Sequence, residues 1–249
     1  NENRIHKKKN IEMKKIIVAV LSLFVAFQGL SAASPDEILN RIEKANSAQS
    51  CVTSSFRHTK VLATKAKKTM EGSQYYVSPD KLAMVYSNPA GDRFTINGNR
   101  VYMNRAGKSQ VYDITKVPMV KRLSSSILDA VCGKVRKLAG DNNADMKVMD
   151  SGSSYIITMT ARQEASTGYA RTTLEYRKSD CILVKLELEE FTHVVNSFSF
   201  DGISTTSSID KAVFEIPAGS TVRGMDFVTR LFQEFVLFFK KTDYLCSPI

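Results

Sequence analysis

The sequence predicts a mainly β fold of the α+β class, built around one large, curved antiparallel sheet. Short runs in which apolar and polar residues alternate recur between turn signals along most of the chain, a pattern typical of many strands. About ten such runs can be counted, and an open sheet of that size tends to curl, which gives it a concave face. Two helical segments, one before the first strand and one between strands, complete the α+β pattern.

The first 33 residues have the composition of segments that precede a fold. Residues 1–12 are polar and basic without apolar periodicity, and we expect an upstream leader outside the native fold. Residues 13–33 combine a Lys14-Lys15 pair, an uncharged apolar run and small residues up to Ala33, which predicts a signal peptide cleaved after Ala33. A retained membrane anchor is the alternative, but the apolar run is shorter than the roughly 20 residues of a spanning helix. We therefore expect export to the periplasm.

The charge of the chain argues against one class of partner. The 35 Lys and Arg exceed the 25 Asp and Glu by 10, and six of the basic and two of the acidic residues lie in 1–33, which leaves +6 for the remainder. These charges form no basic stripe interleaved with aromatic residues, so nucleic acid is not an expected partner. Residues 34–224 are enough for a single domain with a sizeable core.

Four cysteines follow the predicted signal peptide: Cys51, Cys132, Cys181 and Cys246. An oxidising compartment permits disulfides, and four cysteines allow three pairings. The irregular spacing favours none of them, and buried unpaired thiols are an equal alternative. No Cys-x-x-Cys occurs, so the sequence has neither a zinc ribbon nor a thioredoxin motif.

The domain begins with a helix followed by a strand. Ser34 as N-cap and Glu37 at the capping-box position predict a helix over 35–48, with an apolar stripe that packs on the sheet. Alternation then predicts a strand over 52–62, and the basic segment 63–68 is typical of a hairpin loop.

The segment 72–103 predicts three consecutive antiparallel strands. A first strand ends before Pro79, which lacks the amide that a ladder needs. Apolar residues then alternate over 82–86 and around Thr95, and Asn97-Gly98 is the strongest short hairpin signal in the chain. One face of this part of the sheet is therefore strongly apolar, either as closed core or as an open surface for a ligand.

A helical insert follows a short strand at 110–112. Apolar residues in 119–132 recur at steps of three and four, which predicts one or two amphipathic helices that end near Gly133 or Gly140. These helices form either an ordinary layer of an α+β core or a lid over the concave side of the sheet.

The rest of the chain returns to strands and ends in an apolar extension. The expected strands cover 147–150, 154–161, 170–176, 183–191, 194–203 and 212–216. Residues 225–249 contain an apolar run that is too short to span a membrane. This extension is an interfacial helix, an aggregation-prone appendage or translated sequence past the end of the domain, and we favour the last.

The sequence lacks the usual patterns of catalytic and metal sites. His58 and His193 lie in strand-like segments without a partner at metal-ligand spacing. No nucleotide-binding, zinc-protease or nucleophile-elbow motif occurs. We therefore expect no catalytic residue, no metal, no cofactor and no enzyme activity.

The order of elements along residues 35–222 is more specific than any single motif. A signal peptide and a capped helix precede Tyr76-Val-Ser-Pro-Asp-Lys-Leu82, the Asn97-Gly98 hairpin, a helical insert after Asp113 and a closing Phe214-Glu-Ile-Pro-Ala-Gly219. This order resembles the LolA family of periplasmic lipoprotein carriers.

The resemblance implies an incomplete β-barrel, with a helical lid over a hollow that holds lipoprotein acyl chains between inner and outer membrane. Each buried methylene contributes about 0.8 kcal/mol, so such chains need a cover in water. The implied partners are triacylated lipoproteins, an inner-membrane lipoprotein-releasing transporter and an outer-membrane acceptor, and we expect a monomer. The expected acyl-chain-binding wall is Val52, Phe56, Leu82, Met84, Tyr86, Phe94, Ile96, Val101 and Met103. The expected lid residues are Met119, Val120, Leu123, Ile127 and Val131.

One position departs from the family pattern. Ser78 stands before Pro79, where the best-known carriers have an arginine that latches the lid. A latch through this position is therefore not expected, and Arg93, Arg100 and Arg105 are candidate substitutes. The alternative function is a LolA-like lipid or lipoprotein sensor or interaction module of the cell envelope.

Overall fold

The computed structural model describes residues 33–163, 168–217 and 222–223, and the following descriptions concern these residues. The predicted leader, the signal peptide before Ala33, the extension at 225–249 and Cys246 lie outside them. Among the described helices, none combines the length and the apolar composition needed to cross a bilayer.

Twelve strands form one open sheet. They are β1 (Cys51–Val61), β2 (Lys67–Val77), β3 (Lys81–Asn88), β4 (Ala90–Asn97), β5 (Arg100–Arg105), β6 (Lys108–Asp113), β7 (Ala144–Ser151), β8 (Ser154–Ala161), β9 (Tyr169–Arg177), β10 (Leu183–Glu190), β11 (Val195–Thr205) and β12 (Val222–Arg223). Their order is β12-β6-β5-β4-β3-β2-β1-β11-β10-β9-β8-β7. Neighbouring strands are antiparallel except β12, which pairs with β6 in parallel. Within the described residues, the two ends of this order, β12 and β7, do not pair with each other.

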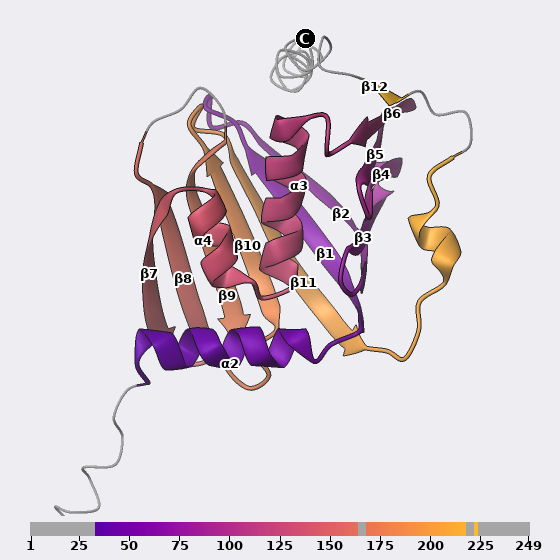
Figure 1. Ribbon diagram of the computed structural model, residues 1–249. Helices are drawn as coiled ribbons and strands as arrows, with labels where there is room; N and C mark the ends of the chain where they lie inside the picture. The colour runs from indigo at the N-terminus through magenta and orange to yellow at the C-terminus, as the bar shows by residue number, and fades with distance from the viewer. Residues whose placement is uncertain (1–32, 164–167, 218–221, 224–249) are drawn as a thin grey trace, which may run out of the picture. The chain divides into compact units, whose positions relative to one another are not determined.

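The path of the chain explains why helices cover one face of the sheet. The chain enters the middle of the sheet at β1, winds to β6 at one side, resumes with β7 at the opposite edge and returns to β11 beside β1. The connection from β6 to β7 must therefore cross the sheet, and it contains α3 (Pro118–Val131) and α4 (Val135–Asp141). Figure 1 shows both helices on the same face as α2 (Pro35–Ser47). The predicted fold class, a mainly β α+β fold with an open curved antiparallel sheet and helices over its concave face, is confirmed.

Most of the predicted elements are present, with changed bounds. The helix predicted over 35–48 and the strands over 52–62 and 154–161 agree within a few residues. The helical insert consists of two helices, α3 and α4. Strand β2 begins at Lys67, so the connection from β1 is shorter than the loop predicted over 63–68.

The number of strands predicted in 72–103 is wrong. This segment contains the end of β2, all of β3 and β4 and most of β5, because β3 and β4 form a tight hairpin whose pairing reaches Ser87 and Ala90. The hairpin predicted at Asn97-Gly98 is present between β4 and β5, and Gly98 adopts a φ of 57° that favours glycine.

The strand predicted over 212–216 is also wrong. A short 3-10 helix, η2 (Lys211–Phe214), occupies most of that segment. The Asp210 carboxylate accepts a hydrogen bond from the Ala212 amide at 2.9 Å and so caps the turn. The buried Phe214 side chain then fixes η2 against β3 and β4.

Candidate functional site

Rows of paired residues form the concave face of strands β1 to β5. Residues that pair directly across neighbouring strands have side chains on the same side of a sheet. The first row contains Val52, Tyr76, Leu82, Ile96 and Val101, the second Ser54, Gln74, Met84, Phe94 and Met103, and the third Phe56, Gly72 and Tyr86. All nine wall residues expected from the sequence lie in these rows, and their role in binding stays a prediction.

The helices cover this face unevenly. Leu82 and Val101 are fully buried, and Met84 in the second row is 2% exposed. The next two residues of that row, Phe94 and Met103, are partly exposed. Apolar wall therefore continues on β4 and β5 beyond the part of the face that is closed to solvent.

The side chains of α3 that are buried differ in part from those expected. Val120 and Val131 are buried as predicted, but Leu123 and Ile127 are partly exposed. Ser124 is 3% exposed instead, because its hydroxyl donates to the Val120 carbonyl at 2.7 Å and needs no partner outside the helix. Leu123 and Ile127 thus lie at the margin of the buried stripe. The side chain of Met119, the remaining predicted residue, lies outside the described part of the structure.

Two tyrosines of the sheet hold the last turn of α3. The Tyr176 hydroxyl donates to the Ala130 carbonyl at 2.6 Å, and the Cys132 thiol donates to the Tyr76 hydroxyl at 3.1 Å. All of these groups are buried. Burial raises the pKa of Tyr76, of Tyr176 and of the Cys132 thiol, so these groups are neutral near pH 7.

Two of the three arginines considered as lid latches have other side-chain contacts in the described residues. Arg93 donates to the carbonyls of Val213 and Glu215 and so ties η2 to the sheet. Arg105 forms an ion pair with Asp92 at 4.0 Å. Arg100 is exposed at the start of β5, and Ser78 is also exposed. Helix α3 is instead held by tyrosine hydroxyls at its last turn, which sequence reasoning missed.

A hydrogen-bonded cluster lies further along β1. His58 is 4% exposed, and its ring stacks on Phe198 with 4.1 Å between centroids. The neutral ring satisfies both nitrogens: Nε2 donates to Asn196 Oδ1 at 3.1 Å, and Nδ1 accepts from the Tyr86 hydroxyl at 3.2 Å. Burial lowers the pKa of His58 to about 3. Within the described part of the chain, His58 is therefore a neutral residue of the core.

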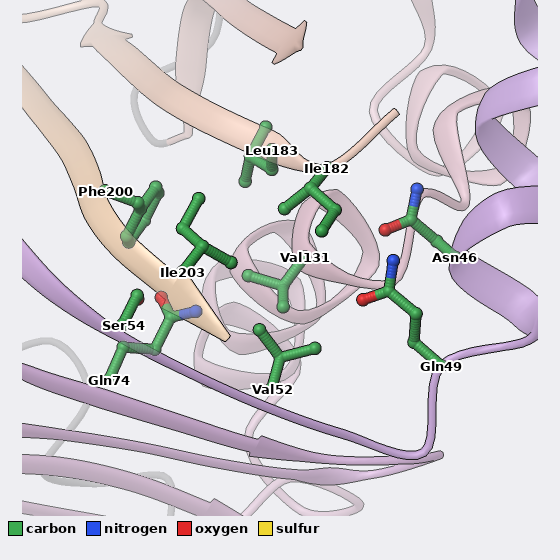
Figure 2. Close-up of a pocket in the computed structure, with 10 residues that line it drawn as sticks. All are labelled: Asn46, Gln49, Val52, Ser54, Gln74, Val131, Ile182, Leu183, Phe200 and Ile203. Atoms are coloured by element: carbon green, nitrogen blue, oxygen red, sulfur yellow. The ribbon is translucent and has the colours of Figure 1, made fainter. Parts of the chain in front are cut away.

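A small pocket of about 10 Å³, which has room for one water-sized group and is partly open to solvent, lies where α2 ends against the sheet. Figure 2 shows Asn46 of α2 and Gln49, which follows that helix, at one side and Ser54 and Gln74 of the sheet at the other. Apolar walls complete it: Val52, Val131, Ile182, Leu183, Phe200 and Ile203. Asn46 fixes one side, because its Nδ2 donates to the carbonyls of Ile42 and Cys181, both at 2.8 Å.

The described residues show no constellation that could hold a metal ion, since no group of three or more His, Cys, Asp or Glu side chains converges there. The three described cysteines, Cys51, Cys132 and Cys181, are buried and unbridged. A pairing that involves Cys246 lies outside the described residues. What the site offers is an apolar surface, a cover and a few neutral hydrogen-bonding groups.

Comparisons of the sequence with family models and with curated proteins find no match. The backbone is similar to that of an uncharacterized conserved protein from Thermus thermophilus, at 11% identity over 77% of this chain and 99% of that chain, with a TM-score of 0.46. It is also similar to a LolA superfamily protein from Nitrosomonas europaea, at 10% identity over 74% and 99% of the two chains, with a TM-score of 0.39. A third similar structure is the MucA/MucB complex of Pseudomonas aeruginosa, at 14% identity over 76% and 62%, with a TM-score of 0.39. The LolA family, which the chain resembles in its order of sequence elements, is thus also named among these similar structures.

Proposed function

We propose that this protein carries lipoproteins through the periplasm and binds their acyl chains between the concave sheet face and α3. The observation that carries the proposal is the apolar wall that continues past the closed core. Phe94 and Met103 on the sheet and Leu123 and Ile127 on α3 are all partly exposed. A fold that used this face only as core would gain by covering these side chains, since burial of an apolar side chain contributes about 1.5–3 kcal/mol.

The energetics of an acyl chain suit such a surface. Each methylene moved from water to an apolar environment contributes about 0.8 kcal/mol, so a carrier needs wall area more than specific contacts. Release requires that the cover can open. In the described part of the chain, the sheet hydroxyls that hold α3 contact only its last turn, and Asn142 adds one side-chain bond at Ser126 in the middle of the helix.

The proposal includes partners but no chemical reaction. A carrier of this kind receives triacylated lipoproteins from an inner-membrane lipoprotein-releasing transporter and delivers them to an outer-membrane acceptor. The neutral tyrosines, thiol and histidine of the site support a binding role, because none of them is arranged as an activated nucleophile or a base poised near neutral pH.

The test is binding of a fluorescent tripalmitoylated lipopeptide to the purified full chain. Phe94→Glu places a charge on the exposed part of the wall, where the fold tolerates it, and we expect the affinity to fall at least about tenfold because the charge must be desolvated. Asn99→Glu in the exposed turn after β4 adds the same charge outside the hollow and should bind like the wild type. Circular dichroism checks that both variants are folded. Equal binding by all three proteins, or none by the wild type, contradicts the proposal.

Depletion in the native cell separates transport from the alternative, a lipid or lipoprotein sensor. Loss of a carrier strands lipoproteins at the inner membrane, which membrane fractionation detects. Loss of a sensor changes an envelope stress response and leaves lipoprotein location unchanged.

A further inference from the structure

Two buried oxygens of the concave face lack hydrogen-bond partners. Ser54 and Gln74 are 6% and 4% exposed, and neither the Ser54 hydroxyl oxygen nor Gln74 Oε1 has a hydrogen-bond partner among the described residues. The two residues pair directly across β1 and β2, and both line the pocket between α2 and the sheet. A buried polar group without a partner is destabilising, so two of them side by side at one pocket need an explanation.

A bulge in β11 makes room at this point. The pairing of β1 with β11 shifts between Thr53 and Ser55, and Gly202 in the bulge has a φ of 58°, which favours glycine. Ser54 therefore has no residue directly opposite it on β11, and Ile203 of the bulge lines the pocket instead. Figure 2 shows Ser54 and Gln74 together at one end of the pocket, with Val131 and Ile203 beside them.

The lining of the pocket limits the chemistry of its occupant. None of its ten lining residues is ionisable. A carboxylate, a phosphate or an ammonium group would lose its hydration there without an opposite charge in the lining. A purely hydrocarbon occupant would leave both oxygens unpaired. A neutral O–H or N–H group attached to an apolar chain satisfies the Gln74 acceptor, and the Ser54 hydroxyl can donate or accept beside it.

We propose that Ser54 and Gln74 form a polar subsite for a neutral hydroxyl or amide N–H group carried on an acyl chain. The subsite rests on the proposed function, since it lies in the second row of the same concave face that contains Met84 and Phe94. The hollow thereby distinguishes acyl ligands by a polar group near the chain, in addition to the length of the chain.

Competition against the tripalmitoylated lipopeptide tests the subsite. The competitors are a medium-chain primary alcohol, the matching primary amide and the matching methyl ether, which has the same chain but no donor. One added neutral hydrogen bond corresponds to about a tenfold gain in affinity. The wild type should therefore prefer the alcohol and the amide over the ether by about that factor, and the ratio of alcohol to amide identifies the group that fits better.

The double variant Ser54→Ala, Gln74→Met removes both oxygens and keeps the approximate shape of the side chains. It should fold at least as well as the wild type, because apolar replacement of unpaired buried polar groups is neutral or stabilising. Its preference for the alcohol and the amide should disappear. Ser55→Ala is the matched control, since Ser55 is exposed on the other face and bonds to the Asp201 carbonyl at 3.0 Å.

The outcomes separate the subsite from the function on which it rests. If the lipopeptide binds but the three competitors displace it equally, or the double variant keeps the preference, the subsite is refuted and the carrier proposal stands. If the lipopeptide does not bind to the wild type, both proposals fail. A preference that is lost only in the double variant supports both.

Discussion

The buried His58 should make the stability of the fold depend on pH in a defined window. The ordinary pKa of 6.5 is lowered to about 3 in the fold, chiefly by burial, and the charges of Arg105, Lys60 and Lys68 act in the same direction. Between these values the unfolded chain binds a proton that the folded chain does not. The contribution of His58 is therefore fully present above pH 6.5 and is lost as the pH falls toward 3.

The size of the effect follows from the two pKa values. One pKa unit corresponds to about 1.36 kcal/mol, so lowering the pH from about 7.5 to about 5 should reduce the free energy of unfolding by about 2 kcal/mol through His58 alone. Glu190 acts in the opposite direction, because burial raises its pKa. Asn196 links the two groups, since its Nδ2 donates to Glu190 at 3.2 Å. The contribution of His58 must therefore be measured as a difference between proteins.

Urea unfolding at several pH values, for the wild type and His58→Gln, provides that difference. The variant is less stable near neutral pH, because the bonds to Tyr86 and Asn196 are disturbed, but the gap should narrow by about 2 kcal/mol as the pH falls to about 5. His193→Asn is the control for removing an exposed imidazole, and its curve should follow that of the wild type. Parallel curves for the wild type and His58→Gln across the whole range would refute the reasoning.

Two further predictions concern packing and the lid. Gly72→Ala should lower the free energy of unfolding by about 1–3 kcal/mol, since a Cβ there would lie 2.2 Å from the Val85 carbonyl oxygen. Gly140→Ala in α4 is the control: its Cβ meets no atom within 4 Å, so the same urea assay should show no change or a gain of up to about 1 kcal/mol. Tyr176→Phe should cost about 0.5–1.5 kcal/mol, because it removes one hydrogen bond from the buried Ala130 carbonyl, which still accepts from the Gly133 amide at 3.2 Å. Tyr102→Phe, whose hydroxyl pairs with the exposed Ser109, should cost less, and equal losses in this pair would show that the bond to α3 has no special weight.

The sequence predicts well which residues share the concave face of the sheet, because strand side chains alternate with a period of two. Once Val52 and Phe56 are placed inward, Ser54 and His58 must lie on the same face. The alternation therefore already places Ser54 and the buried histidine on the inner face. It does not show the partners of their polar atoms, because these lie on other strands.

Cross-strand contacts could not be read from the sequence in the same way. The pairing of Ser54 with Gln74 depends on the register set by the hairpin between β1 and β2, and the room beside it depends on the bulge at Gly202. The sequence likewise could not predict which side of α3 faces the sheet. Its apolar periodicity pointed to Leu123 and Ile127, but Ser124 could replace them inside because its hydroxyl is satisfied within the helix.

The crossover from β6 to β7 explains how one face can be both core and hollow. The connection must pass over the sheet, so α3 is a part of the core by topology and cannot be removed without exposing the face. Its attachment is nevertheless asymmetric: the tyrosine bonds lie at Ala130 and Cys132 in the last turn, whereas Val117 at the first turn makes no side-chain capping bond. An opening movement that keeps the tyrosine bonds would pivot about the last turn and lift the first turns of the helix. Under the proposed carrier function, such a movement would admit a chain at the partly exposed side of the wall while the end near the proposed polar subsite stays closed, so that an acyl group could be held and then released.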